Sequence, residues 1–234
     1  MTELTLHPIA HIESDFPALF GIPRQSGLVP ELTARIILEP LYRDPSAFRG
    51  LEGFSHLWLL WGFSANKREG WAAAVKPPRL GGNRTMGVFA TRSPYRPNPV
   101  GLSCVRLERV ELTKKNGPVL HVSGADLMDG TPIYDIKPYL PYTDSRPEAV
   151  GGFAEAFADY ALEVEFPPQL QNRLPPEKRE AAARLLARDP RPAYIDDPER
   201  IYGVLFAGFD LRFRVEGQRL YVVDAVPAEG AKKA

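Results

Sequence analysis

Short runs of apolar and β-branched residues recur from residue 4 to residue 140, and turn-forming residues separate them. Proline, glycine, asparagine and aspartate stand between the runs, a pattern that predicts strands. Asn116-Gly117 lies between two such runs and predicts a hairpin turn, because both residues accept the positive φ of tight hairpins. We therefore expect an all-β, barrel-like domain here. The expected strands are 4–12, 32–38, 56–63, 86–91, 102–112 and 119–122.

A second region begins near residue 144 and mixes both kinds of secondary structure. Pro175-Pro176 opens a segment whose alanines, leucines and charges favour a helix. Asp189-Pro190-Arg191-Pro192 ends that helix, since proline cannot continue the hydrogen-bond ladder. The expected elements are a strand at 157–166, a helix at 177–188 and a closing hairpin of 202–215 with 220–226.

The fold class expected is mainly β, with a β-barrel-like N-terminal domain (1–143) and a small α+β C-terminal domain (144–234). No expected strand is followed by a G-x-G-x-x-G turn and a helix, so the sequence predicts a non-Rossmann protein. P-loop, G-x-S-x-G and H-E-x-x-H motifs are also missing from the sequence. Any catalysis must therefore use another scaffold.

Composition excludes several classes of protein. No run approaches the roughly eighteen uninterrupted apolar residues that a membrane helix needs, and the first residues do not resemble a signal peptide. The single cysteine, Cys104, excludes an intrachain disulfide and favours a reducing compartment, so we expect a cytoplasmic protein. Four scattered histidines show no zinc-ligand spacing, and no metal site is expected.

Charge is unevenly distributed although the net charge is zero. Between Gly70 and Leu107 the basic residues are Lys76, Arg79, Arg84, Arg92, Arg96 and Arg106, and there is no acid. Such a local positive field inside a neutral chain is what a specific polyanion contact requires. A solvated basic face is the alternative.

Two loops combine backbone freedom with cations. Residues 23–28 (PRQSGL) join two expected strands, and their glycine would let the backbone approach a ligand closely. Three prolines within 94–99 stiffen a loop that presents Arg92, Tyr95 and Arg96. A stiff loop loses little entropy when it binds phosphates and a base. A simple turn is the alternative for the first loop, and a structural loop with solvated arginines for the second.

Residues 124–142 interleave three acids and three tyrosines with turn formers, so little of this stretch is expected in a core. Its carboxylates would suit ribose hydroxyls or an ammonium group, and Asx turns are the alternative. Residues 51–63 indicate a buried strand with a loop ahead of it. His56 in that segment is interpreted as a hydrogen-bonded core histidine and not as a base.

These segments, in this order, closely resemble the TsaA-like family, and more specifically its tRNA (adenine-N6)-methyltransferase branch, TrmO. The similar stretches include PRQSGL, GLEGFSHLWLLWGF, PPRLGGNRTMGVFATRSPYRPNPVGLS and DLMDGTPIYDIKPYLPY, and the similarity continues through RDPRPAY to the C-terminal hairpin. The resemblance implies methyl transfer from S-adenosylmethionine to N6 of threonylcarbamoyladenosine at tRNA position 37, beside the anticodon. It also implies a homodimer, with a small C-terminal domain that assists tRNA binding.

The same resemblance implies which residues contact the cofactor. They lie in the PRQ-x-G-L loop, after the tryptophan-rich strand, in the ATRS and GLS motifs and around the first acid of DLMDGTP: Ser26, Gly27, Leu28, Ser64, Arg92, Leu102, Asp126 and Leu127. The resemblance also implies a polar, histidine-like residue after Phe63, and this chain departs from that pattern with Ser64-Ala65. From the basic run we expect Arg84 and Arg96 to contact tRNA phosphates.

The implied chemistry needs a proton acceptor. N6 of the modified base is a ureido nitrogen, so methylation needs in-line placement of the sulfonium and removal of the N–H proton. We expect Asp126 to act on the cofactor and either Asp129 or Asp135, still unassigned, to face the base. The alternative function is a non-catalytic dimeric module that binds S-adenosylmethionine or nucleic acid without turnover.

Overall fold

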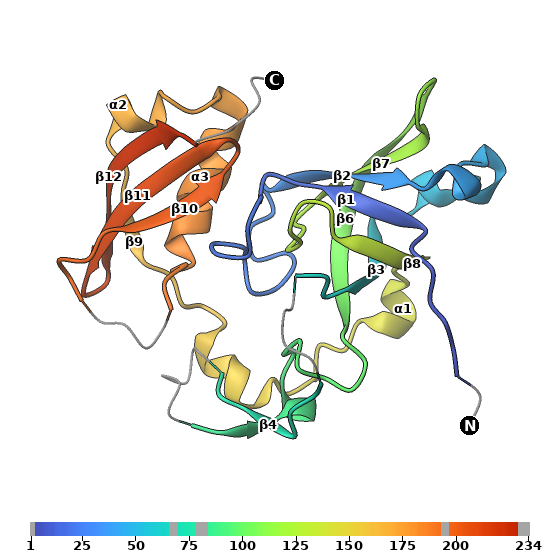
Figure 1. Ribbon diagram of the computed structural model, residues 1–234, viewed down its shortest axis with the longest axis horizontal. Coiled ribbons are helices and arrows are strands. Elements are labelled where there is room, and N and C mark those ends of the chain that lie inside the picture. The colour runs from blue at the N-terminus through green and yellow to red at the C-terminus, as the bar shows by residue number, and fades with distance from the viewer. Residues whose placement is uncertain (1–2, 66–69, 78–83, 193–196, 229–234) are drawn as a thin grey trace.

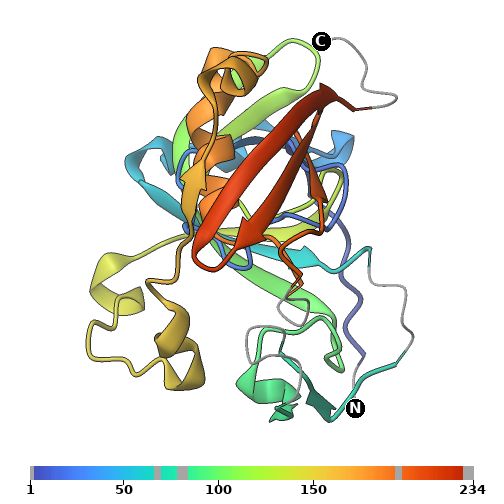
Figure 2. The ribbon, with the colours of Figure 1, turned by 90° about the vertical axis from the view of Figure 1, so that its left-hand side faces the viewer.

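The computed structural model describes residues 3–65, 70–77, 84–192 and 197–228. Two units lie side by side in Figure 1, a β-barrel and a smaller sheet that carries the longest helix, α3. A short two-stranded arm projects beyond the barrel, and Figure 2 shows the same arm from the side.

Six antiparallel strands close the barrel in the order β1-β2-β7-β6-β3-β8, which confirms the expected mainly β, barrel-like fold. Along β6, Gly101, Ser103, Val105 and Leu107 are buried and alternate with more exposed neighbours, because successive side chains point to opposite faces of a sheet. The strands are β1 Ala10–Glu13, β2 Thr33–Leu38, β3 His56–Gly62, β6 Val100–Thr113, β7 Gly117–Ser123 and β8 Pro132–Pro138.

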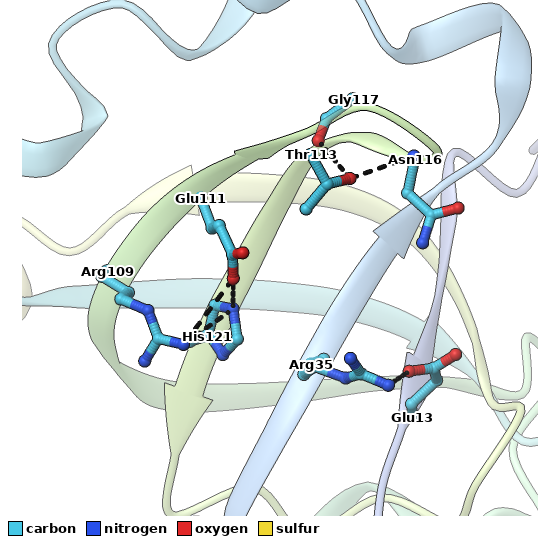
Figure 3. A network of polar contacts seen from close by, with 8 residues as sticks. All are labelled: Glu13, Arg35, Arg109, Glu111, Thr113, Asn116, Gly117 and His121. Carbon is cyan, nitrogen blue, oxygen red and sulfur yellow. Dashed lines mark hydrogen bonds and ion pairs between the residues drawn. The ribbon is translucent and has the colours of Figure 1, made fainter.

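A hairpin turn joins β6 to β7 as expected, but residues 114–116 make the turn, and Gly117 already pairs with Thr113 as the first residue of β7. Figure 3 shows the Thr113 hydroxyl donating to the Gly117 carbonyl (3.1 Å) and accepting from the Asn116 amide (3.0 Å). On the same outer face, His121 is hydrogen-bonded to Glu111, and ion pairs join Arg109 to Glu111 and Arg35 to Glu13. Such partly exposed pairs each add little to stability.

Two barrel strands differ from the expectation. Residues 4–8 were expected in the first strand, but they are exposed ahead of it and only Ala10–Glu13 joins the barrel. Strand β8 was not expected, because its prolines and acids indicated turns. Both prolines stand at the ends of the strand, where a missing N–H is tolerated. Leu127 and Ile133 are fully buried, so the prediction that this stretch contributes little to the core was wrong.

The arm consists of β4 (Ala74–Val75) paired with β5 (Met86–Gly87). The strand expected at 86–91 is therefore wrong beyond Gly87, since Val88–Ala90 is a 3₁₀ turn. The loop folds back on itself there: the Arg96 guanidinium donates to the carbonyls of Val88 (3.3 Å) and Thr91 (2.6 Å).

The C-terminal unit is a four-stranded sheet of order β10-β11-β12-β9, with β9 parallel to β12 and α3 packed against it. The run 202–215 forms two strands and not one, because Ala207 and Gly208 both adopt positive φ and make a tight turn. The strand expected at 157–166 shrinks to Glu163–Glu165. Helix α1 (Pro141–Asp144) follows β8 and lies beside the barrel, where Trp58 of β3 donates to Asp144. The elements of the C-terminal unit are β9 Glu163–Glu165, α2 Pro168–Gln171, α3 Pro176–Ala187, β10 Tyr202–Phe206, β11 Phe209–Glu216 and β12 Arg219–Pro227.

The connection between β1 and β2 links the two units. Phe16, Val29 and Leu32 belong to it, yet their side chains are buried in the apolar core of the C-terminal unit. At its start, Asp15 pairs with Lys178 of α3 at 2.5 Å, and neither side chain is more than about a fifth exposed. The loop that resembles a cofactor-binding motif is therefore held between barrel and C-terminal unit.

Candidate active site

A cavity of about 850 Å³ opens at the rim of the barrel, where β6 and β7 part. Strand β6 pairs with β3 from Val100 to Arg106, but with β7 only from Arg106 onward. The β1–β2 connection approaches the edge that β7 leaves. The cavity wall comes from that connection (19–25), the end of β3 (58–65), the loop after the arm (91–96), the start of β6 (100–102) and the turn after β7 (126–131).

Two hydrogen bonds fix the PRQSGL loop to the barrel. The Cys104 amide donates to Ser26 Oγ at 3.1 Å, and the Gly27 amide donates to the Gly124 carbonyl at 2.8 Å. Gly27 and Gly124 have φ of +77° and +74°, the left-handed region that favours glycine. The Ser26 hydroxyl thus accepts a hydrogen bond from β6, and this bond helps to hold the loop in position.

Three side chains form a hydrogen-bonded chain that ends in the cavity. Trp61 Nε1 donates to Ser103 Oγ at 2.9 Å, and Ser103 Oγ donates to Asp126 Oδ1 at 2.6 Å. Trp61 and Gly101 face each other across β3 and β6, and a Cβ on Gly101 would lie 2.3 Å from the indole ring. The indole can lie over β6 and reach Ser103 only because residue 101 has no side chain.

Asp126 carries the one carboxylate among the described residues that line the cavity. Burial raises the pKa of this carboxyl above its usual range, and it outweighs the lowering effects of the Ser103 hydrogen bond, the Arg92 charge and the Ser26 amide. Such a carboxylate is a stronger base than an exposed one. Asp126 therefore combines fixed orientation with raised basicity, as a proton acceptor needs.

The cavity lining also contains positively charged side chains. Arg24, Arg92 and Arg96 all line the cavity. Arg92 donates to the Gln25 side-chain carbonyl, and the Gln25 amide donates to the Arg24 carbonyl, so the ATRS loop contacts the PRQSGL loop directly. A guanidinium has five N–H donors, so Arg92 and Arg96 keep donors for an anionic ligand beyond those bonds.

The structure brings together most of the cofactor residues implied by the family resemblance. Ser64, Arg92, Leu102, Asp126 and Leu127 line the cavity, and so does Arg96. Ser26 and Gly27 adjoin Arg24 and Gln25, which line it as well. Leu28 lines a second cavity of about 320 Å³ between the loop and the end of α3.

Three other residues from the sequence analysis lie away from this cavity lining. Asp129 Oδ1 accepts from the Ser14 amide at 3.0 Å, and Asp135 pairs with Lys137 at 2.8 Å. Arg84 is exposed. The structure therefore does not bring Asp129 or Asp135 to the cavity with Asp126.

Sequence reasoning missed Trp61, Ser103 and Gln25. Trp61 lies in a segment that was assigned to packing, and Ser103 lies in the short GLS motif. Only the register of β3 against β6 brings the two side chains together. The motif G-L-S opposite a tryptophan-rich strand was the available signal. This signal predicts a contact between Trp61 and Ser103 only when the pairing of β3 with β6 is known.

Within the described ranges, no three histidine, cysteine, aspartate or glutamate side chains gather in a way that could hold a metal ion. No helix in those ranges is long and apolar enough to cross a membrane.

Two family models match the chain in succession. The tRNA-methyltransferase O N-terminal domain matches residues 11–145, and the TrmO C-terminal domain matches residues 159–228. The chain belongs to the tRNA-methyltransferase O family. The resemblance seen in the sequence is thereby confirmed.

Two bacterial relatives in this family are similar to the chain over most of their length. The tRNA (adenine(37)-N6)-methyltransferase of Escherichia coli is 42% identical over 223 residues, which cover 92% of this chain and 94% of that protein. The protein of the same name from Eikenella corrodens is 47% identical over 75% of this chain and 98% of its own length. The TrmO crystal structure from Pseudomonas aeruginosa superposes with a TM-score of 0.76 at 35% identity, covering 97% of this chain and all of that one. These TrmO relatives confirm that the chain is an enzyme.

Proposed function

We propose that this chain methylates N6 of adenosine 37 in tRNA with S-adenosylmethionine, and that the adenosine it uses is threonylcarbamoylated. The observation that carries the proposal is the cavity at the barrel rim, which is lined by one partly buried carboxylate, Asp126, and by arginines of two loops. The names of the Escherichia coli and Eikenella corrodens relatives support the reaction and its position in tRNA.

The cavity residues fit S-adenosylmethionine. Its volume of about 850 Å³ lies in the usual range for small-molecule sites, about 300–1,000 Å³. Trp61, Phe63 and Leu102 supply apolar surface for a purine, and Arg92 supplies a cation for an amino-acid carboxylate. A relative from Pyrococcus abyssi, 34% identical over 63% of this chain, is named a probable S-adenosyl-L-methionine-binding protein, which supports the same cofactor.

The charge balance supports the threonylcarbamoyl group. Three arginines face one aspartate among the described cavity residues, so the site can neutralise more than one carboxylate. S-adenosylmethionine has one carboxylate, and the threonyl part of the modified base has another. We assign Arg92 to the cofactor and Arg24 or Arg96 to the threonyl carboxylate.

S-adenosylmethionine supplies the methyl group when it is bound. The N6 proton must leave the ureido nitrogen. We assign its acceptor to the Asp126 carboxylate, which was expected from the sequence to act on the cofactor, in place of Asp129 or Asp135. Ser103 fixes Oδ1 by its hydrogen bond, and Trp61 fixes Ser103. The two loops exclude water from one side of the carboxylate, and their arginines hold the substrate anions in place.

The other features expected from the sequence and from its family resemblance stay part of this proposal. They are a cytoplasmic homodimer, a catalytic domain of residues 1–143, a C-terminal domain of 144–234 that assists tRNA binding, and tRNA contacts by Arg84 and Arg96. Exposed Arg84 and the arm that carries it extend the positive field of the cavity outward, which supports an RNA contact at the cavity mouth.

The experiment that tests the proposal mixes the chain with methyl-labelled S-adenosylmethionine and bulk tRNA. We expect label in the tRNA fraction and S-adenosylhomocysteine as the product. Cofactor binding by calorimetry without label in tRNA would favour the alternative, a binding module without turnover. The absence of both would contradict either function.

A further inference from the structure

The RDPRP motif that follows α3 (residues 188–192) has no part in the proposed reaction. Its described part, Arg188–Pro192, turns the chain sharply, and Asp189 adopts a φ of +51°. Arg191 pairs with Asp189 through two hydrogen bonds of 2.8 and 3.0 Å, and the Tyr160 hydroxyl donates to the same carboxylate at 3.0 Å. We call Tyr160 and Arg188–Pro192 the α3 corner.

The α3 corner is rigid. The Asp189 and Arg191 side chains are only 13% and 11% exposed. Burial alone would raise the pKa of Asp189, but the hydrogen bonds and charge of Arg191, with the Tyr160 hydroxyl, hold that pKa below its usual range. A planar guanidinium that donates through two of its nitrogens to one carboxylate restricts the orientation of both side chains. The backbone of the corner is therefore a firm support for whatever it contacts.

The α3 corner contacts the PRQSGL loop from the side opposite the barrel. Arg188 Nε donates to the Leu28 carbonyl at 3.3 Å, while its Nη1 donates to the Tyr160 carbonyl at 3.3 Å. In the other direction, Arg24 Nη2 donates to the Arg191 carbonyl at 3.3 Å. The α3 corner thus donates to a main-chain oxygen of the loop, and the loop donates to a main-chain oxygen of the α3 corner.

The loop has few alternative positions between these two supports. The barrel holds it through the amides of Cys104 and Gly27, and the α3 corner holds it through Leu28. Just before the loop, a Cβ on Gly21 would lie 2.5 Å from the Val204 side chain of β10, so the C-terminal unit packs closely there too. A change on the corner side must alter the position or mobility of Leu28 and its neighbours.

We propose that Arg188 is a positioning residue: the C-terminal unit, through this side chain, sets the conformation of the PRQSGL loop and so the affinity of the cavity for S-adenosylmethionine. The inference rests on the proposed function for the identity of the ligand. It gives the C-terminal unit a role at the cofactor site that is separate from any contact with tRNA.

The test compares Arg188→Ala with Arg179→Ala. Arg179 is a matched control, because it lies on α3, which ends just before Arg188, and because it also donates to two main-chain carbonyls, of Leu174 and Asn172, both within the C-terminal unit. We expect the Kd for S-adenosylmethionine, measured by calorimetry without RNA, to rise about three- to tenfold in Arg188→Ala, the usual effect of losing such hydrogen bonds. The Arg179→Ala variant should bind the cofactor like the parent even if its Tm falls.

A second measurement separates positioning from general stability. Hydrogen exchange at the Gly27 amide, which bonds to Gly124, should become faster in Arg188→Ala and stay unchanged in Arg179→Ala. Arg188→Lys keeps one cation that can reach only one of the two carbonyls, so both effects should be intermediate; this variant also serves if the alanine variant does not fold. Equal Kd and equal exchange in parent and Arg188 variants, or equal changes in the Arg179 control, would overturn the proposal. Failure of the parent to bind S-adenosylmethionine would instead remove the proposed function.

Discussion

At the scale of single residues, Asp126 gives the clearest test of the chemistry. Asp126→Asn keeps the shape of the side chain but removes the base, so the single-turnover methylation rate should fall about a hundred- to ten-thousandfold. Cofactor affinity, measured on the same sample, should change little if the carboxylate faces the substrate. Asp129→Asn and Asp135→Asn are controls from the same stretch of chain. Near-parental rates in Asp126→Asn would show that another group takes the proton.

The pH dependence of the reaction follows from the raised pKa of Asp126. A base works only when deprotonated, so the rate should fall as the pH drops through that raised pKa, above the range of an ordinary carboxyl group. Ser103→Ala removes a hydrogen bond that lowers the pKa, and the acidic limb of the profile should move to higher pH. An acidic limb that stays in place in Ser103→Ala would contradict the role of the Trp61–Ser103–Asp126 chain.

Burial of Asp126 also has a consequence for folding. An acid whose pKa is raised by folding disfavours the folded state when it is ionised, at pH values above that pKa, and this cost disappears as the pH falls through it. Asp126→Asn should therefore be at least as stable as the parent near neutral pH, so a loss of rate cannot be attributed to unfolding.

Arg92 tests the assignment of the cofactor carboxylate. Arg92→Ala should weaken S-adenosylmethionine binding by about 1–3 kcal/mol, the typical contribution of a charge-assisted hydrogen bond. Arg109→Ala is the matched control, since Arg109 lies on the outer face of the barrel beside Glu111 (Figure 3). Unchanged affinity by calorimetry in a folded Arg92→Ala chain would remove this assignment.

At the scale of elements, the pairing of β3 with β6 shapes the site through Gly101. Gly101→Ala places a methyl group 2.3 Å from the Trp61 ring, so the indole must move and its bond to Ser103 must break. Overpacking of this kind typically destabilises a protein by about 1–3 kcal/mol, and we expect a lower methylation rate as well. Gly87→Ala is the control, because Gly87 has a φ of −60° and open space around its Cα. A normal rate and Tm in Gly101→Ala would contradict the predicted displacement.

The elements that could be predicted from sequence are those whose signal is local. Strands rich in β-branched residues, the hairpin turn between β6 and β7, and helix α3 were predicted because propensity and burial agree there. Strand β8 was missed because its prolines stand at its ends, and the 86–91 strand was wrong because arginine bonds fold that loop back on itself.

The candidate site could be predicted only in part. Arg92, Leu102 and Asp126 came from a motif resemblance, and the structure brings them together at one cavity. Asp126, Asp129 and Asp135 look alike in sequence. Only the turn after β7 decides that the first of them lines the cavity while the others bind Ser14 and Lys137. The contact of Arg188 with Leu28 joins residues 160 positions apart, and no local pattern reports it.

At the scale of the whole molecule, a neutral chain must bind a polyanion through one basic region. The affinity for tRNA should fall steeply with salt, since phosphate contacts release counterions. Arg84→Gln should flatten the slope of log affinity against log salt by about one and leave the Kd for S-adenosylmethionine unchanged, because Arg84 is exposed and outside the cavity lining. A parent slope near zero would place the basic run away from the RNA.

We propose that the cavity methylates a threonylcarbamoylated adenosine and not a plain one. The most direct test presents one tRNA in two forms, with and without the threonylcarbamoyl group at position 37, to the chain and S-adenosylmethionine, and follows the mass of the released nucleosides. We expect the threonylcarbamoyl nucleoside to gain one methyl group and the plain adenosine to stay unmodified. Equal methylation of both forms, or methylation of neither while the cofactor is bound, would contradict the proposal.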